Sequence, residues 1–122
     1  MKKFVFICFL EIFFILVIPS RVFASTDEVA SFHSDIVINQ DTSISITEQI
    51  DYTTDLEKHG IYRYIPTAYN HNGQKEILPV RDLVVTNGVG LEQPFTKSFD
   101  GKFVTLKIGD PDVTFTGKRI YH

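Results

Sequence analysis

After residue 24 the chain contains no cysteine, and tryptophan is absent from the whole sequence. The single cysteine, Cys8, lies within an apolar run at the N-terminus. The residues that follow this run therefore have no disulfide and no thiolate ligand for zinc, and their stability must come from a hydrophobic core. The 98 residues from 25 to 122 form one domain, large enough to hold such a core.

Motifs that mark common catalytic sites are also missing from the sequence. We find no G-x-S-x-G elbow, no P-loop and no Cys/His pair. Glu48 and Asp51 lie close together, but their odd spacing on a strand turns them to opposite faces. The histidines lack the short spacing of a zinc site and are scattered over His33, His59, His71 and His122. We therefore expect no enzyme activity, no cofactor and no metal ion.

The first 24 residues have the layout of a secretory signal peptide. Two lysines precede an apolar run over residues 4–18, and Val22-Phe23-Ala24 ends the segment with a small residue. The run is shorter than the ~20 residues of a membrane span, and its apolar side chains outweigh the insertion cost of Glu11. We expect cleavage between Ala24 and Ser25. Two alternatives stay open: a retained N-terminal anchor, or a core helix with Glu11 at the edge of its apolar face.

The domain left after cleavage is acidic. Removal of residues 1–24 takes away three of the 12 basic side chains and one of the 15 acidic ones. Nine basic and 14 acidic side chains are left, which gives a formal charge of −5. Because an acidic domain is a poor partner for nucleic acid or for an anionic membrane surface, we expect no nucleic-acid partner.

Apolar and polar side chains alternate with a period of two along the domain, which predicts strands. Two strands, over residues 29–39 and 44–52, are separated by a polar turn and predict a long antiparallel hairpin. Shorter strands are predicted over residues 83–85, 95–99, 104–108 and 113–115, with a type I′ turn at Asp100-Gly101 and another strand beginning at residue 120. Residues 53–81 are predicted as a long loop that is either functional or contains short hidden strands.

Strands at this spacing, with no convincing helix after the signal segment, predict an all-β fold. We expect an antiparallel, Ig-like β-sandwich over residues 25–122, preceded by the helix of the signal peptide. A strand that begins at residue 120 is unfinished at His122 and leaves an unpaired edge, which folded proteins usually avoid. We therefore expect the last strands of the domain to be truncated.

The densest cluster of candidate binding residues is Tyr62, Arg63 and Tyr64. Tyrosines offer flat amphipathic surface and an arginine offers a planar fork for a carboxylate, so one interpretation is a recognition loop. The alternative is structural, with the apolar neighbours in the core and Arg63 paired with an acidic side chain nearby. Glu48 falls on the apolar face of its strand, where an acid usually has a partner. We predict that Glu48 pairs with Arg63 or with another basic side chain.

Asp110-Pro111-Asp112 is the one stretch that offers neighbouring carboxylates of the kind that calcium prefers. It lacks the oxygen-rich spacing of a defined calcium loop. We therefore interpret it as a tight turn.

Several stretches of the chain, taken in order, carry a family resemblance. They are Ile36-Val37-Ile38, Ser45-Ile46-Thr47-Glu48-Gln49-Ile50-Asp51-Tyr52, His59-Gly60-Ile61-Tyr62-Arg63-Tyr64-Ile65-Pro66, Arg81-Asp82-Leu83-Val84-Val85, Lys107-Ile108-Gly109-Asp110-Pro111-Asp112 and Thr116-Gly117. Together they resemble the N-terminal domain of the DUF2207 family, predicted bacterial membrane proteins of unknown function, over residues 28–121. The resemblance implies an extracytoplasmic β-sandwich followed by a transmembrane helix that these residues do not include. It implies no catalytic residues.

The expected function is therefore that of a non-enzymatic extracytoplasmic domain with a binding or sensing role at the cell envelope. Its partner would be an envelope protein or a component of the cell wall, and its contact surface would be Tyr62, Arg63 and Tyr64. If the chain ends at His122, the protein would be secreted. Two other functions stay open: a secreted calcium-dependent adhesion-type module and a secreted hydrolase.

Overall fold

The computed structural model describes residues 24–122, and all of them belong to strands, turns or loops. Residues 1–23 lie outside this part, and with them the predicted signal-peptide helix. The strands are β1 (Asp27–Ile38), β2 (Ile44–Lys58), β3 (Gly60–Pro66), β4 (Ala68–His71), β5 (Gln74–Ile77), β6 (Phe95–Phe99), β7 (Phe103–Gly109) and β8 (Phe115–Tyr121). Among the described residues there is no helix with the length and apolar character that crossing a bilayer requires.

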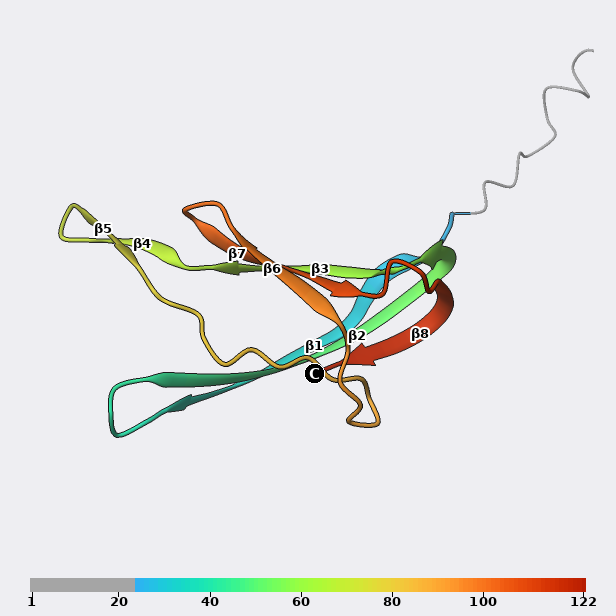
Figure 1. Ribbon diagram of the computed structural model, residues 1–122, viewed down its shortest axis with the longest axis horizontal. Coiled ribbons are helices and arrows are strands. Elements are labelled where there is room, and N and C mark those ends of the chain that lie inside the picture. Colours follow the sequence, from blue (N-terminus) through green and yellow to red (C-terminus); the bar gives the residue numbers. More distant parts are fainter. Residues whose placement is uncertain (1–23) are drawn as a thin grey trace, which may run out of the picture.

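The strands form three antiparallel sheets. Sheet A has the order β1-β2-β8, sheet B has the order β3-β7-β6, and β4 pairs only with β5. Figure 1 shows that sheets A and B come together at the end where β2 continues into β3, while the β1-β2 and β4-β5 hairpins extend at the other end. The predicted all-β fold with antiparallel sheets is therefore confirmed, and so is the long hairpin of β1 and β2.

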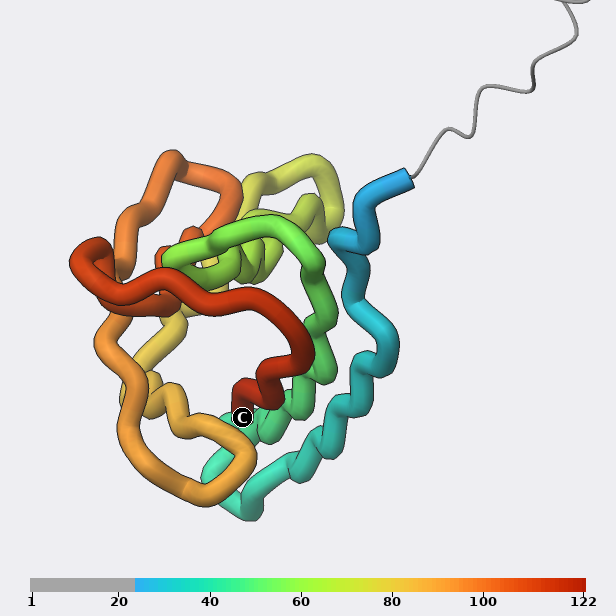
Figure 2. Tube along the Cα trace, turned by 90° about the vertical axis from the view of Figure 1, so that its right-hand side faces the viewer, coloured from blue at the N-terminus to red at the C-terminus, as the bar shows by residue number. Residues whose placement is uncertain are grey.

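Both sheets contribute side chains to a single core. Its buried members are Ile50, Tyr52, Val85, Val104, Leu106, Ile108, Phe115 and Tyr121. The ring of Tyr52 meets that of Phe115 edge-on, with the centroids 6.1 Å apart. Viewed along the long axis in Figure 2, β1, β2 and β8 curve around one side of the core, and the orange loop between β5 and β6 passes around the other. Sheets A and B thus enclose one interior.

The chain passes between the two sheets at a corner built on two glycines. β2 ends at Lys58 and β3 begins at Gly60, while Gly109, the last residue of β7, lies opposite Gly60 in the ladder. A Cβ atom on Gly60 would lie 1.7 Å from the carbonyl oxygen of Ile108, and one on Gly109 would lie 2.1 Å from that of His59. Gly109 also has φ 129°, which side chains rarely allow. The corner therefore requires glycine at both positions.

Residues 53–81 do not form the predicted long loop. The alternative prediction, that this segment contains short hidden strands, is confirmed. β2 continues to Lys58, and β3, β4 and β5 follow within the segment. The reason is visible in β3, where the inward row contains a charged Arg63 and the outward row contains two large tyrosines. The side chains of β3 alternate between the two faces of the strand. Polar and apolar residues do not follow that alternation, so the sequence pattern did not indicate a strand.

Three smaller predictions also need correction. Residues 83–85 form no strand, although Val85 is buried and the following residues make isolated bridges. The strands predicted at residues 113–115 and from residue 120 are replaced by one continuous β8, whose centre is polar and contains Gly117 at φ 83°. β6 and β7 do form a hairpin, but the backbone N–H of Asp100 donates to the Phe103 carbonyl and Gly101, not Asp100, has a positive φ, so Asp100-Gly101 is not the central pair of a type I′ turn.

Replacement of Gly60 by alanine tests the corner. Since the new Cβ would overlap the Ile108 carbonyl, we expect Gly60→Ala to lower the free energy of unfolding by about 3–5 kcal/mol. The control is Gly101→Ala, at φ 87° with nothing within 4 Å of the added atom. It should cost only about 1–2 kcal/mol of backbone strain. Urea unfolding of both variants measures the difference, and equal losses would contradict the role of the corner.

Candidate functional site

β3 separates the three predicted binding residues onto two faces of sheet B. The side chains of Tyr62 and Tyr64 point outward, with 58% and 55% of their surface exposed. Arg63, between them, points toward sheet A, because successive side chains of a strand alternate between its faces. The structure therefore brings the two tyrosines together and takes Arg63 away from them.

The outward tyrosines belong to a surface to which all three strands of sheet B contribute. Their rings are nearly parallel, at 16°, with centroids 6.3 Å apart. In the ladder, Tyr62 lies opposite Lys107 and Tyr64 lies opposite Thr105, and these two residues of β7 lie in turn opposite β6. We call this surface the tyrosine face, and it comprises Tyr62, Tyr64, Thr96, Ser98, Thr105 and Lys107.

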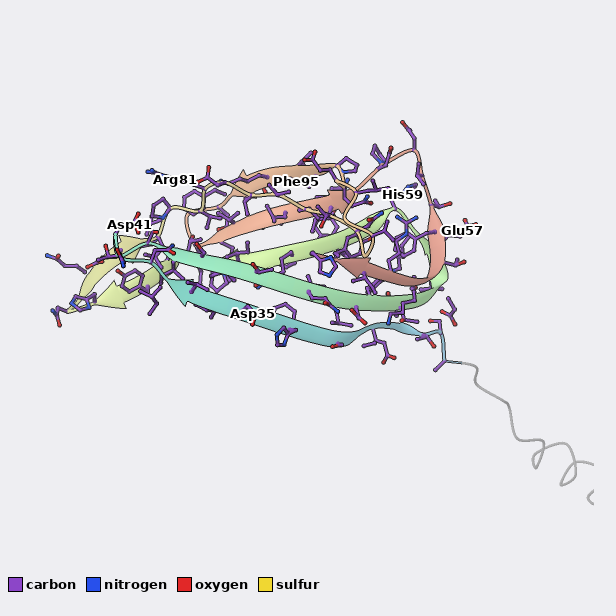
Figure 3. All side chains as sticks on the ribbon, turned by 90° about the horizontal axis from the view of Figure 1, so that it is seen from below. Asp35, Asp41, Glu57, His59, Arg81 and Phe95 are labelled. Carbon is purple, nitrogen blue, oxygen red and sulfur yellow. The ribbon has the colours of Figure 1, made fainter. Side chains whose placement is uncertain are left out.

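Charge is distributed unevenly between the two sheets. β3, β6 and β7 contain no acidic residue and three basic ones, Arg63, Lys97 and Lys107. In sheet A, β1 and β2 contain seven acidic residues and one basic residue, and β8 adds two basic residues, Lys118 and Arg119. Figure 3 shows Asp35 on β1 and Glu57 near the end of β2, whereas Phe95 lies on the other sheet. The tyrosine face is therefore free of carboxylates in a domain that is acidic as a whole.

Arg63 links the two sheets through an ion pair with Glu48 of β2. Its Nε and Nη2 atoms donate to the two carboxylate oxygens at 2.7 and 2.5 Å. The side chains are only 25% and 23% exposed, and the guanidinium lies 5.5 Å from the centroid of the Phe32 ring. These hydrogen bonds to the Glu48 carboxylate raise the pKa of Arg63 above its usual range. The predicted pairing of Glu48 with Arg63 is confirmed.

A second cluster, which the sequence did not reveal, joins the beginning of β1 to β2. The Tyr52 hydroxyl donates to Oδ1 of Asp27, and Lys58 Nζ donates to Oδ2 at 2.8 Å. These hydrogen bonds, that from Lys58 first, lower the pKa of Asp27. Both clusters border a shallow groove of about 760 Å³ between the β1-β2 hairpin and β3. Since its cations are paired with acids, the groove offers few free polar groups to a ligand.

A smaller hollow of about 460 Å³ borders Arg119 and Tyr121 of β8. Arg119 lies over the Phe115 ring, 4.1 Å from its centroid. The Tyr121 hydroxyl has no hydrogen-bond partner among the described residues, and burial raises the pKa of this group. Because the hydroxyl is enclosed in the core, it cannot contact a molecule placed in the hollow.

The far half of the β1-β2 hairpin exposes a second apolar surface. Two cross-strand pairs form it, Ile36 with Ile46 and Ile38 with Ile44, and every member is more than half exposed. These side chains share the face of β2 that carries Ile50 into the core. The surface therefore continues the packing face of the sheet, whereas the tyrosine face lies on an outer side.

No group of three or more His, Cys, Asp or Glu that could hold a metal ion occurs within residues 24–122. Asp110 Oδ1 accepts a hydrogen bond from the backbone N–H of Asp112 at 2.8 Å. Asp110 thus serves a local turn, which is the interpretation that its spacing favoured.

The sequence did not reveal the neighbours of the tyrosines. Lys107, Thr105, Thr96 and Ser98 come from strands more than 30 residues further along the chain. The alternation of apolar and polar residues along β7 places Thr105 and Lys107 on one face of that strand. It was the one sequence signal for these neighbours of the tyrosines. Their position opposite the tyrosines depends on the register between β3 and β7, which only the structure provides.

Comparison with known proteins finds one family. A model described as the N-terminal domain of a predicted membrane protein (DUF2207) matches residues 28–118. No curated protein and no solved structure matches the chain. The match includes every residue of the tyrosine face and both glycines of the corner.

Replacement of Glu48 by glutamine tests the link between the sheets. It leaves the partly buried Arg63 without its counter-charge, so we expect Glu48→Gln to lower the free energy of unfolding by about 1–3 kcal/mol. The control is Asp35→Asn, in a pair with His33 whose side chains are 71% and 70% exposed. It should change stability by less than about 0.5 kcal/mol. Chemical unfolding of both variants at neutral pH measures the effect, and equal values would contradict the link.

Acid titration tests the Asp27 cluster. Because its hydrogen bonds hold the pKa of Asp27 below the ordinary value of 3.8, the cluster stabilises the fold above pH 3.8. This contribution is lost as the pH falls through the lowered value. We expect Asp27→Asn to reduce the fall in melting temperature between about pH 5 and pH 2. The control is Glu57→Gln, at an exposed position on the neighbouring strand β2. If the melting temperature of Asp27→Asn falls with acid as much as that of the unmodified protein, the prediction is contradicted.

Proposed function

We propose, since the chain belongs to the DUF2207 family of predicted membrane proteins, that residues 25–122 form a non-enzymatic, extracytoplasmic binding domain at the cell envelope. The signal-peptide layout of the first 24 residues supports export. The two sheets that share one core support an Ig-like sandwich. The partner would be another envelope component, recognised on the tyrosine face.

The exposed pair of tyrosines is the observation that carries this proposal. Tyr62 and Tyr64 leave more than half of their surface in water, although each would be stabilised by contact with another molecule. Tyrosine is enriched at binding surfaces because it supplies a large contact area at a low cost in conformational entropy. The tyrosines are not needed for the core, which is filled from the opposite side of sheet B. We therefore assign the contact with the partner to the outer side of sheet B.

Labelling of engineered cysteines in intact cells tests the proposal. In a Cys8→Ser background, Ser98→Cys adds a thiol to the tyrosine face, and Thr47→Cys adds one to an exposed position of β2. We expect a membrane-impermeant maleimide to label both thiols without permeabilisation, because the domain is extracytoplasmic. We expect Ser98→Cys to react more slowly in cells than in purified protein, because a partner covers it there.

The two thiols separate the two parts of the proposal. If Thr47→Cys is labelled only after permeabilisation, the extracytoplasmic position is wrong. If Ser98→Cys reacts equally fast in cells and in purified protein, while Thr47→Cys is labelled in intact cells, the tyrosine face is not the contact surface.

A further inference from the structure

We propose that the tyrosine face binds an acidic glycan, a chain of sugars that carries isolated carboxylates or phosphates. The inference rests on the proposed function and names the class of partner for its contact surface. It is carried by three features of sheet B: the arrangement of the aromatic rings, the polar groups beside them, and the distribution of charge.

The ring arrangement suits sugars that follow one another in a chain. Tyr62 and Tyr64 stack along one row of β3, with nearly parallel rings whose centroids are 6.3 Å apart, and more than half of each side chain is exposed. Aromatic faces bind flat apolar surfaces, and the C–H faces of pyranose rings are of this kind. Small molecules prefer concave sites, whereas this face is open. An extended polymer therefore fits better than a single small ligand.

The remaining side chains of the tyrosine face provide polar contacts at the edges of such rings. Thr105 of β7 lies opposite Tyr64, and Ser98 of β6 lies opposite Thr105 one strand further away, so two hydroxyls follow the second ring across the sheet. Each hydroxyl both donates and accepts hydrogen bonds, as sugar hydroxyls do. Sugars that stack on the tyrosines would thus find partners for their own hydroxyls on β6 and β7.

Charge selects an anionic glycan over a neutral one. Lys107 lies opposite Tyr62 and, among the described residues, forms no ion pair. Lys102 lies 5.2 Å from the centroid of the Phe103 ring, at the end of β7 that faces Pro66, but its charge acts on the nearby carboxylate of Asp100. Lys107 thus provides the ammonium group on a face without carboxylates. It complements an anionic group carried by a polymer.

Charge also disfavours nucleic acid on this face. Nucleic acids carry a phosphate at every nucleotide, and their binding depends on many basic contacts. The seven acidic residues of β1 and β2 oppose a polyanion of such density. A glycan with sparse anionic groups needs only the local cations of sheet B.

Binding of defined polymers to the full chain tests the inference. The probes are hyaluronan oligosaccharides, which carry carboxylates, and a phosphomannan, which carries phosphates. Isothermal titration should show binding of at least one of them, and which one binds identifies the anionic group. Neutral dextran, polyglutamate and single-stranded DNA should bind at least tenfold more weakly.

Variants then locate the site. Tyr62→Ala and Tyr64→Ala should each weaken binding about tenfold, the effect of losing one stacked aromatic ring. Lys107→Ala should weaken binding and reduce its dependence on salt, because one ionic contact is lost. The matched control is Tyr69→Ala, which removes an exposed tyrosine from β4 and should leave affinity unchanged. Tyr62→Phe keeps the ring and should retain binding, which separates stacking from a general loss of structure.

Several results would overturn the inference: no binding of either acidic glycan, tighter binding of DNA or polyglutamate, or equal affinity in Tyr62→Ala and Tyr69→Ala. The labelling of Ser98→Cys in cells is independent of these probes. Protection of that thiol without glycan binding would reject the glycan and keep the binding function. A freely reactive thiol would reject the tyrosine face as the contact surface, and the glycan proposal with it.

Discussion

The direct contact between Gly60 and Gly109 is the constraint on which the rest of the structure depends. Since neither residue has a side chain, the backbones of β3 and β7 can approach where the chain passes from one sheet to the other. This contact also sets the register of the two strands. With Gly60 opposite Gly109, Tyr62 must lie opposite Lys107, and Arg63 must point into the space between the sheets.

Register matters here because a slip of one residue would exchange the two faces of β3. Such a slip would bury two tyrosines and expose Arg63, leaving Glu48 on the inner side of sheet A without its counter-charge. The cost of that unpaired, partly buried carboxylate opposes the slip. The ion pair therefore keeps the tyrosines outward although it does not touch them. The structural interpretation of this stretch is confirmed for Arg63, which points inward and pairs with Glu48, whereas binding by the outward side of the strand stays a proposal.

Sequence patterns predicted the strands in which apolar residues occupy one face and polar residues the other. The β1-β2 hairpin and the core row of β7 alternate cleanly, and an acid on the apolar face of β2 required a basic partner. β3 escaped prediction because its inward row contains an arginine, and β8 because its centre is polar. The tyrosine face combines strands far apart in the sequence, so that no local pattern contains it. The glycine contact belongs to the register of β3 against β7, and the pairing of β6 with β7 completes the face.

The same topology separates the charges of the domain. The hairpin of β1 and β2 carries seven acidic residues, whereas sheet B carries none, although the chain passes directly from β2 into β3. An acidic sheet keeps the domain soluble and repels dense polyanions. A sheet without carboxylates can still attract a sparse anion at short range, because salt screens the opposing charges beyond about 10 Å. The proposed selectivity for weakly anionic partners thus follows from the difference in charge between the two sheets. The chain passes from the acidic sheet to the sheet without carboxylates at the glycine corner.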